Sequence, residues 1–401
     1  MTATTQQDSF QLARWLRDAQ PEALRELLAE AGGSQVLTFA LGLPPTECFP
    51  QEAFARATAE LFRRDPEALQ LGAPYQPIKR HIVELMRQRG VECTEEEVFL
   101  TSGAQQALGL AAGLFLETGG RVLLEETSYL GFHHVIKPRS PQFVTVPTNL
   151  DDGIDLDAVE AVLSKGERPA LMYAMSDGHN PLGISLSPAK RTRLAEMARN
   201  YRVPLIEDDP YGFLLYDEVQ PPPMRAQEKR WVFYAGSLSK VLSPSLRLGW
   251  LLVPPELTSR LSILRQSMDI DSSNLAQKAA TVYLESGHLT THLTALRREL
   301  KARRDAMLSA LERHFPAGCR WSRPSSGVFV WVELPKHVNT LELLRVSLRE
   351  EKVVFVPGSE FWCGKDPSGG RNCMRLSFSN LAPAQIEEGI GRLARALKKI
   401  G

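Results

Sequence analysis

The chain has 401 residues, and its 47 lysines and arginines balance its 47 aspartates and glutamates, so its formal net charge is zero. Hydrophobic residues make up 43% of the sequence, which is ordinary for a globular protein and excludes a disordered or collagen-like chain. Because binding to nucleic acid or anionic lipid draws on clustered positive charge, we expect small-molecule or protein partners, with no nucleic acid and no membrane.

The sequence also lacks the signals of export. Its longest wholly apolar run, residues 107–116, is too short to span a bilayer, and the N-terminus lacks the basic-then-apolar pattern of a secretory signal. Its five cysteines form no C-x-x-C pair, which argues against a disulfide framework or a structural zinc site. We therefore expect a cytoplasmic protein with reduced thiols and no metal.

The N-terminal segment, residues 1–45, holds an amphipathic helical stretch at 13–31 and a loop with the sequence LGLPP. It is too short to fold alone, so we expect it to pack on the C-terminal domain or on a second subunit. Further along, the acidic run at 95–97 is most simply a solvated helix or turn start.

The central part of the chain alternates short β-rich runs with helical stretches. We expect strands at 98–103, 121–126, 170–175, 204–209, 231–240 and 248–254, and helices that include one beginning near 105 and one at 188–201. Such alternation predicts a parallel sheet covered by helices on both faces. Ligands of these sheets bind at the carboxyl ends of the strands, so the residues just after each run should carry the chemistry.

After residue 286 the pattern changes. A long charged helix is expected at 288–314, followed by a strand at 328–334, a helix at 341–351, β-rich runs at 353–358 and 374–379, and a last helix at 383–399. These elements predict a second, α+β domain. We therefore expect a large domain at 46–287, a small domain at 288–401 and the segment 1–45 packed on the small domain or on a partner subunit.

Lys240 ends one of the predicted strands in the sequence SLSK, with Ser237 and Ser239 before it and Arg247 seven residues after it. An amine, two hydroxyl donors and a fixed cation are the parts needed for a Schiff base with a phosphate-bearing aldehyde. A surface lysine near a turn is the alternative for S-x-S-K alone, and the extension to Arg247 argues against it.

Asp208 ends another strand, with Tyr211 three residues later. A carboxylate held against a pyridine nitrogen keeps that nitrogen protonated, although acidic pairs at strand ends are more often helix caps or metal ligands.

Asn180, in the sequence NPLG, can donate to a phenolate oxygen such as that of pyridoxal phosphate. Plain turn chemistry is an equally good interpretation of N-P-x-G when it stands alone.

A strand-turn-helix start comprises Ser102, Gly103, Ala104 and Gln105, where free backbone N–H groups and the helix dipole suit a phosphate. An ordinary helix cap is the alternative there.

Arg375, on a strand of the second domain, has a guanidinium that can clamp a carboxylate through two parallel hydrogen bonds. An exposed or salt-bridged arginine is the alternative for that position.

Taken together, in this order and at these separations, the motifs resemble the class I/II aminotransferase family of fold-type-I pyridoxal-phosphate (PLP) enzymes. The likeness is closest to the branch of 2-aminoadipate and kynurenine aminotransferases and runs from LGLPPTECFP to MRLSFSN. The resemblance implies an α/β fold: a large domain with a mostly parallel seven-stranded sheet sandwiched by helices, and a small α+β domain. It also implies a homodimer. The implied activity is PLP-dependent transfer of the amino group of an L-amino acid to a 2-oxo acid, by a ping-pong aldimine and ketimine mechanism.

The resemblance also assigns roles by position. Lys240 would form the Schiff base and move the proton, Asp208 would pair with the pyridine nitrogen, and Tyr211 would bond the ring oxygen. Asn180 would bond the same oxygen, Tyr129 would stack on the ring, and the substrate carboxylate would meet Gly42, Asn180 and Arg375. The phosphate would lie among or beside Ser102, Gly103, Ala104, Gln105, Ser237, Ser239 and Arg247.

Three positions depart from the pattern of the branch. Leu71 stands where a tyrosine of the partner subunit usually reaches the phosphate, Leu182 replaces the threonine of N-P-T-G, and Ser326 replaces a glycine of a Gly-Gly pair. The apolar Leu71 favours amino acids with apolar or aromatic side chains over short acidic ones.

Two other functions are compatible with these motifs. Another PLP reaction in a biosynthetic pathway, such as elimination, cyclisation or oxidation, would use the same cofactor groups. A regulator is a third possibility, because related domains occur fused to DNA-binding domains, but about 45 residues before the first motif are too few for a winged helix. His179, beside Asn180, is a candidate for a supporting role in the pocket. His288 and His292 lack the glutamate of H-E-x-x-H, and we expect a solvated helix end there.

Overall fold

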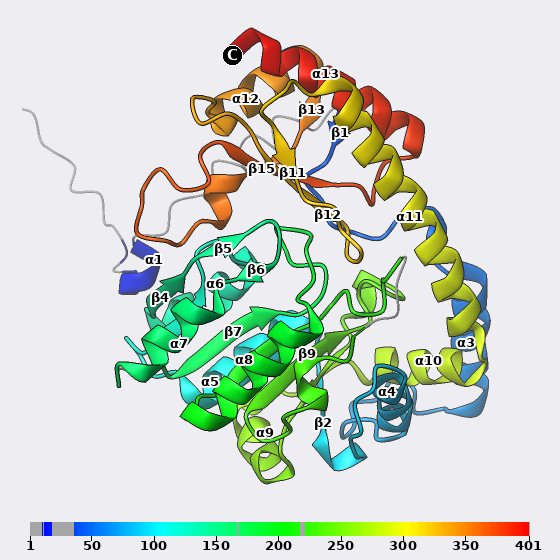
Figure 1. Ribbon diagram of the computed structural model, residues 1–401. Coiled ribbons are helices and arrows are strands. Elements are labelled where there is room, and N and C mark those ends of the chain that lie inside the picture. The colour runs from blue at the N-terminus through cyan, green and yellow to red at the C-terminus, as the bar shows by residue number, and fades with distance from the viewer. Residues whose placement is uncertain (1–9, 11, 18–35, 167, 217–220, 401) are drawn as a thin grey trace, which may run out of the picture.

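The computed structural model describes residues 10, 12–17, 36–166, 168–216 and 221–400. A large α/β part lies below a smaller α+β part in Figure 1. The helix expected at 13–31 falls mostly outside the described residues, which include only α1 (Arg14–Arg17) of that stretch.

The large part is built on a seven-stranded sheet with the strand order β2-β10-β9-β8-β7-β3-β4. The strands are β2 (Val98–Thr101), β3 (Arg121–Glu125), β4 (Gln142–Val146), β7 (Leu171–Met175), β8 (Leu205–Asp208), β9 (Val232–Ser237) and β10 (Gly249–Leu252). Neighbours from β9 to β4 run parallel, and only β10 runs antiparallel to both of its neighbours. This confirms the mostly parallel seven-stranded sheet expected from the sequence.

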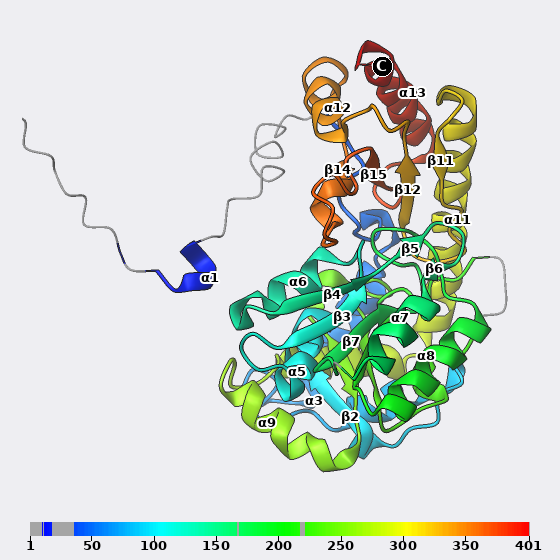
Figure 2. The same cartoon turned by 60° about the vertical axis from the view of Figure 1, so that its left-hand side comes forward.

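Both faces of this sheet are apolar, as a doubly covered sheet requires. In β7, Tyr173 and Met175 belong to one buried cluster, whereas Met172 and Ala174 belong to another, because successive side chains of a strand point to opposite faces. Helices that cover the first face include α5 (Ala104–Phe115), α6 (Leu130–Ile136) and α9 (Thr258–Gln266), and the second face is covered by α7 (Leu156–Ser164) and α8 (Pro188–Tyr201) (Figure 2).

Two local predictions need correction. Strand β4 was not predicted, because it is an edge strand whose side chains are mostly half-exposed and therefore carry a weak apolar pattern. Glu97, expected in a solvated turn, is buried and accepts a hydrogen bond from Arg225 Nη2 at 2.7 Å. The partner that makes this burial favourable lies 128 residues away and is invisible in the local sequence.

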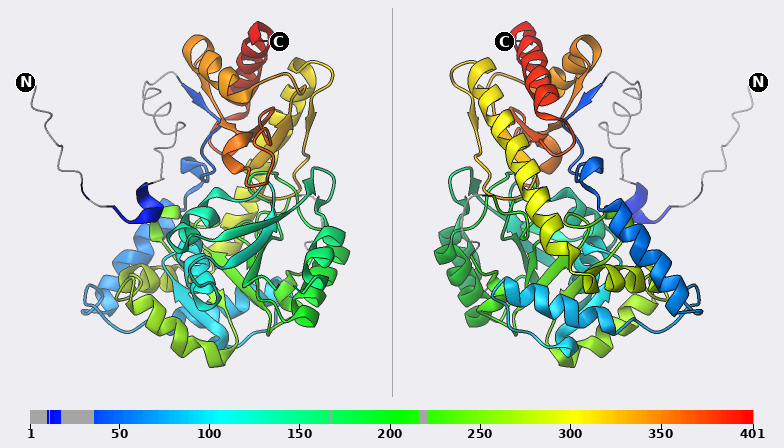
Figure 3. Two further views of the ribbon diagram at one scale, coloured as in Figure 1. Left: turned by 90° about the vertical axis from the view of Figure 1, so that its left-hand side faces the viewer. Right: turned by 90° about the vertical axis from the view of Figure 1, so that its right-hand side faces the viewer.

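The small part is a four-stranded antiparallel sheet with helices against it. Its strand order is β11-β12-β15-β14, from β11 (Arg320–Trp321), β12 (Phe329–Glu333), β15 (Cys373–Ser377) and β14 (Val356–Pro357). Helix α11 (His288–His314) packs against α13 (Pro383–Ile400) and extends alongside both parts of the molecule (Figure 3). From the N-terminal segment, β1 (Leu37–Thr38) pairs in parallel with β13 (Val353–Val354) of this part.

Further helices and strands lie within these two parts. They are the helices α3 (Gln51–Arg64), α4 (Pro77–Gln88), α10 (Asn274–Glu285) and α12 (Thr340–Val346), the short strands β5 (Thr148–Asn149) and β6 (Gly153–Ile154), and a five-residue π-helical turn at Ser347–Glu351. Within the described part of the chain, no helix is both long enough and apolar enough to cross a membrane.

Candidate active site

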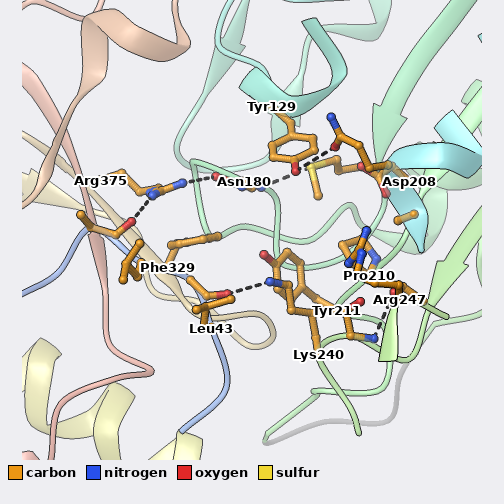
Figure 4. Close-up of a pocket in the computed structure, with 18 residues that line it drawn as sticks. Leu43, Tyr129, Asn180, Asp208, Pro210, Tyr211, Lys240, Arg247, Phe329 and Arg375 are labelled. Atoms are coloured by element: carbon orange, nitrogen blue, oxygen red, sulfur yellow. Dashed lines mark hydrogen bonds between the residues drawn. The ribbon is translucent and has the colours of Figure 1, made fainter. Parts of the chain in front are cut away.

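One pocket gathers the chemistry-bearing residues, and it lies where three adjacent parallel strands end (Figure 4). The last residues of β7, β8 and β9 are Met175, Asp208 and Ser237, and all three line it. The complete lining is Ala40, Leu41, Gly42, Leu43, Ala104, Gln105, Tyr129, Met175, Asn180, Asp208, Pro210, Tyr211, Ser237, Ser239, Lys240, Arg247, Phe329 and Arg375. All site residues predicted from the sequence are among these except Ser102 and Gly103, which lie in the adjoining turn before α5.

Lys240 is the amine of this pocket. Its Nζ donates to the backbone oxygen of Gly42 at 2.8 Å. Burial lowers the pKa of the Lys240 ammonium to about 8, and the positive charges of Arg375 and Arg247 act in the same direction. A larger fraction of this amine is therefore neutral near pH 7 than for an exposed lysine, and only the neutral form is a nucleophile.

Asp208 is a buried carboxyl group with one oxygen unused. Its Oδ2 accepts from the Tyr173 hydroxyl at 2.8 Å, whereas Oδ1 is buried with no partner among the described residues. Burial raises the pKa of Asp208 to about 7; the hydrogen bond from Tyr173 opposes this shift, and the Asp209 carboxylate adds to it. A protonated pyridine nitrogen would supply both the missing donor and the missing positive charge.

The start of α5 forms an anion cradle. Gly103 is its N-cap, with φ at 87°, and no side chain caps the helix there. The Arg247 guanidinium donates to the Ser102 oxygen at 3.0 Å, and it would lie 2.7 Å from a Cβ atom at Gly103. This positive φ favours glycine, and a side chain there would also displace the Arg247 guanidinium. Free N–H groups at a helix N-terminus beside a guanidinium suit a phosphate.

Two serines complete the cradle in different ways. The Ser237 hydroxyl donates to the Leu248 oxygen at 3.1 Å and accepts from the Ser239 backbone N–H at 3.0 Å, so it shapes the turn. The Ser239 Oγ atom is buried and has no partner among the described residues. A buried unpaired hydroxyl is costly, so this atom also fits a ligand oxygen. The residues of the pocket therefore fit a cofactor that carries both a pyridine ring and a phosphate.

Arg375 lies at the opposite end of the pocket from Arg247 in Figure 4. It donates to Asn180 Oδ1 at 2.9 Å and to the Ala40 oxygen at 2.5 Å, and its guanidinium lies 4.2 Å from the centre of the Phe329 ring. Because a guanidinium can only donate, the Asn180 oxygen must face it, which leaves the Asn180 amide N–H groups to donate elsewhere. Burial lowers the pKa of Arg375 to about 10, an effect that a bound carboxylate would offset.

Tyr129 and Tyr211 contribute aromatic surface to the pocket. Gln105 accepts from the Tyr129 hydroxyl at 3.5 Å and donates to the Gly131 oxygen at 2.9 Å, so its side chain holds the turn that carries Tyr129. Burial raises the pKa of Tyr129 to about 12. The Tyr211 ring meets Phe329 edge-on, with ring centres 6.0 Å apart.

Several residues of the site were missed from the sequence. Tyr173, which donates to Asp208, had one available signal, since a tyrosine inside a buried strand needs a partner for its hydroxyl. The apolar lining residues Leu43, Met175 and Phe329 carry no chemical motif. Gly42 was predicted to meet the substrate carboxylate. The structure adds a steric reason for glycine at this position, because a Cβ atom there would lie 2.3 Å from the Phe329 ring.

The departures from the family pattern are accommodated locally. Ser326 is fully buried, and its hydroxyl donates to the Tyr211 oxygen at 3.4 Å. Its neighbour Gly327 keeps a positive φ of 79°, and a Cβ atom there would lie 2.8 Å from the Cα atom of Gly178. Leu182 is buried, whereas Leu71 is 67% exposed and lies outside the pocket lining.

The histidine pair weighed as a metal site is arranged differently from a metal centre. His292 Nε2 lies 2.8 Å from the Val241 oxygen, to which its N–H can donate. Among the residues that the structure describes, no group of three or more histidine, cysteine or acidic side chains could hold a metal ion.

The sequence and the fold of this chain are similar to those of known proteins. The family model described as aminotransferase class I and II matches residues 37–393. The chain is 38% identical to a 2-aminoadipate transaminase of Thermus thermophilus, over 94% of each chain. It is 34% identical to aromatic-amino-acid aminotransferase 1 of Thermococcus litoralis, over 94% of this chain and 91% of that one. The crystal structure of Pyrococcus horikoshii kynurenine aminotransferase in complex with PMP superposes with a TM-score of 0.91 at 31% identity, covering 97% of both chains.

Proposed function

Because this chain belongs to the class I and II aminotransferase family and is a PLP-dependent aminotransferase, we propose that the pocket at the ends of β7, β8 and β9 is its active site. One observation carries the proposal. Two buried polar atoms with no partner among the described residues, Asp208 Oδ1 and Ser239 Oγ, lie on the wall of the same pocket as Lys240. They match the two ends of the cofactor, its pyridine nitrogen and its phosphate.

The cofactor would be held as follows. Asp208 receives the pyridine N–H, the phosphate lies between Ser239, Arg247 and the start of α5, and Tyr129 covers the ring. Asn180 and Tyr211 bind the ring oxygen, since the Asn180 amide N–H groups are the ones left free to donate. When bound, the cofactor supplies an electron-withdrawing ring that stabilises negative charge at the α-carbon of the amino acid.

The residues of the chain supply binding and proton transfer. Arg375 binds the α-carboxylate of the amino acid, with Asn180 and the backbone of Gly42 beside it. Lys240 takes the proton from the α-carbon and returns it, for which its lowered pKa of about 8 is well suited near neutral pH. Tyr211, which lines the same pocket, completes the proposed catalytic set.

We further propose that the amino donor is an L-amino acid with an apolar or aromatic side chain and that the acceptor is a 2-oxo acid. Among the pocket residues not assigned to the cofactor or the carboxylate, Leu41, Leu43, Met175 and Phe329 are apolar. An apolar wall gains free energy from an apolar side chain and leaves an acidic one unpaired. The related enzymes named for aromatic amino acids and kynurenine support a bulky aromatic donor, whereas the 2-aminoadipate transaminase supports only the length of the donor, because the 2-aminoadipate side chain is acidic.

The test is a single-turnover measurement of the cofactor absorbance against a panel of phenylalanine, leucine, kynurenine, 2-aminoadipate and aspartate. We expect the half-reaction to be fastest with an apolar or aromatic donor, and fastest conversion of an acidic donor, aspartate or 2-aminoadipate, would contradict the substrate class. Product analysis separates transamination from elimination, cyclisation or oxidation, because only transamination yields one new amino acid for each 2-oxo acid released.

We also propose a homodimer located in the cytoplasm. Exposed apolar side chains occur on two segments near the pocket end that holds Arg247: Leu69 and Leu71 are 76% and 67% exposed, and Met268 and Ile270 are 56% and 74% exposed. A second copy covering them would remove this surface from water. Light scattering should give about twice the chain mass of 44.6 kDa, and a fully active monomer would contradict the dimer.

The five free cysteines support a reducing compartment, which cell fractionation tests.

A further inference from the structure

His179 is a buried histidine that none of the roles above uses. Its side chain is 3% exposed, and its Nε2 atom lies 3.0 Å from Glu125 Oε2, a carboxylate that is itself 4% exposed. Its other ring nitrogen, Nδ1, accepts the backbone N–H of Leu182 at 3.4 Å. A nitrogen that accepts carries no proton, so the proton is on Nε2, which donates to Glu125.

Glu125 is an anchored partner for this ring. Its second oxygen, Oε1, accepts from the Thr148 hydroxyl at 2.7 Å, so both carboxylate oxygens have a donor. Glu125 is the last residue of β3, and His179 follows the adjacent parallel strand β7. The contact therefore ties two loops together at the same edge of the sheet, and each loop carries a residue of the pocket: Tyr129 follows Glu125, and Asn180 follows His179.

The backbone of the His179 loop closes without the side chain. The His179 N–H donates to the Ile184 oxygen at 2.7 Å, and the His179 oxygen accepts from Gly183 N–H at 2.6 Å. These bonds fix the shape of the loop, whereas the imidazole fixes where the loop sits against β3. Loss of the side chain would therefore remove the link to β3 and leave the bonds that give the loop its shape.

The position of this loop matters at the substrate end of the pocket. Asn180, next to His179, accepts from Arg375 at 2.9 Å. The Arg375 guanidinium is otherwise held by the Ala40 oxygen and by contact with the rings of Phe329 and Phe361. A shift of Asn180 would thus move the Arg375 guanidinium. A carboxylate binds this group well only when both carboxylate oxygens align with its N–H groups.

We propose that His179, anchored by Glu125, is a positioning residue that holds Asn180, and through it Arg375, in place for the amino-acid carboxylate. This inference rests on the proposed function of Arg375. Lys240, Asp208 and Ser239 make their hydrogen bonds with other groups, so most of the contacts proposed to hold the cofactor do not depend on the His179 side chain. Losing the pair should weaken substrate binding far more than cofactor binding.

The experiment compares PLP-loaded wild type with His179→Leu and His179→Gln. We expect His179→Leu to lower kcat/KM for the amino acid by roughly tenfold to a hundredfold, mainly through a higher KM, because a small misplacement of a clamp is costly. PLP content, measured by absorbance, should stay at the wild-type level. His179→Gln, whose amide N–H can still donate to Glu125, should recover most of the loss.

A matched control is available at the surface. His314 and Glu387 form a histidine–glutamate pair at 2.7 Å that is far more exposed and lies on α11 and α13. His314→Leu should leave KM unchanged. An equal rise of KM in His314→Leu, an equal loss in His179→Gln and His179→Leu, or a wild-type KM in His179→Leu would each overturn the proposal.

A gentler variant tests the same anchor if His179→Leu does not fold. Thr148→Val removes the hydroxyl that donates to Glu125 while keeping the side-chain shape. We expect a smaller rise of KM with full PLP content, and an unchanged KM would overturn the proposal. Failure of the proposed function is a separate result, because it requires that the wild-type protein bind PLP and transfer no amino group from any amino acid.

Discussion

The Lys240 ammonium donates to the backbone oxygen of Gly42 at 2.8 Å, across 198 residues of sequence. Two residues before Gly42, the Ala40 oxygen accepts from Arg375 at 2.5 Å. One short loop therefore offers neutral carbonyl oxygens to both the amine and the guanidinium of the pocket. A substrate carboxylate is a stronger acceptor than a carbonyl, so it can replace the loop at Arg375.

The first prediction concerns Lys240 itself. Purified protein loaded with PLP should be yellow, and Lys240→Ala should lose both the native absorbance band and the transaminase activity, because no other amine lines the described pocket. Lys190→Ala, at an ion pair with Asp152 outside the pocket lining, is the control and should keep the band. A colourless wild-type protein that takes up no added PLP would refute the assignment.

The second prediction uses the lowered pKa of Lys240. Only the neutral amine attacks an aldehyde, and burial lowers the pKa of Lys240 to about 8. The rate at which apoprotein takes up PLP should therefore rise with pH through about 8 and level off above it. Stopped-flow absorbance at fixed PLP concentration measures this rate. A rate that keeps rising to pH 10 would show that Lys240 titrates like an exposed lysine.

The third prediction concerns Asp208. Asp208→Asn should keep PLP but lose most turnover, because an amide cannot hold the pyridine nitrogen protonated. Asp157→Asn, at an exposed helix position, is the control. Wild-type turnover in Asp208→Asn would mean that Asp208 is not the partner of the nitrogen.

Asp208 also has a consequence for stability without cofactor. Burial raises its pKa in the folded chain to about 7, so between the ordinary aspartate range and pH 7 the folded chain holds a proton that the unfolded chain has lost. Stability should therefore fall as pH rises through this window. Apoprotein carrying Asp208→Asn has no such carboxyl group and does not lose this stability. The Tm of the variant relative to that of wild-type apoprotein should therefore increase as the pH is raised from 5 to 8.

The fourth prediction concerns Arg375. Arg375→Lys keeps the charge but loses the planar pair of donors, so kcat/KM should fall by roughly tenfold to a hundredfold, or about 1.5–3 kcal/mol, with PLP binding retained. Arg320→Lys, at an exposed position on β11 of the same sheet, should leave kcat/KM unchanged. Equal values for Arg375→Lys and wild type would remove Arg375 from the substrate site.

The fifth prediction compares Leu71 with Arg247. Leu71 has no hydroxyl and lies outside the pocket lining, whereas Arg247 lines the pocket at the end proposed to bind the phosphate. Leu71→Ala should therefore reduce PLP retention on dialysis less than Arg247→Ala does. If both variants release PLP equally fast, Leu71 contributes to phosphate binding through the partner subunit.

The amino-acid sequence by itself determined a mostly parallel sheet covered by helices and the set of groups in its pocket, whereas the number of seven strands came from the resemblance to the family. The apolar strands alternate with helices, so they could only form a sheet covered on both faces, and the ends of its parallel strands had to converge. Met175, Asp208 and Ser237 meet there for this reason. Edge strand β4 escaped prediction because a half-exposed strand lacks that apolar pattern.

Only the tertiary structure decided which of these groups are paired and which are left open. The Tyr173 hydroxyl takes one oxygen of Asp208 and leaves the other unpaired, and Glu125 meets His179 across 54 residues of sequence. Backbone oxygens such as those of Ala40 and Gly42 leave no trace in the sequence, because every residue carries one. Hydrogen bonding depends on positions within a few tenths of an ångström, which are set only when distant segments pack together.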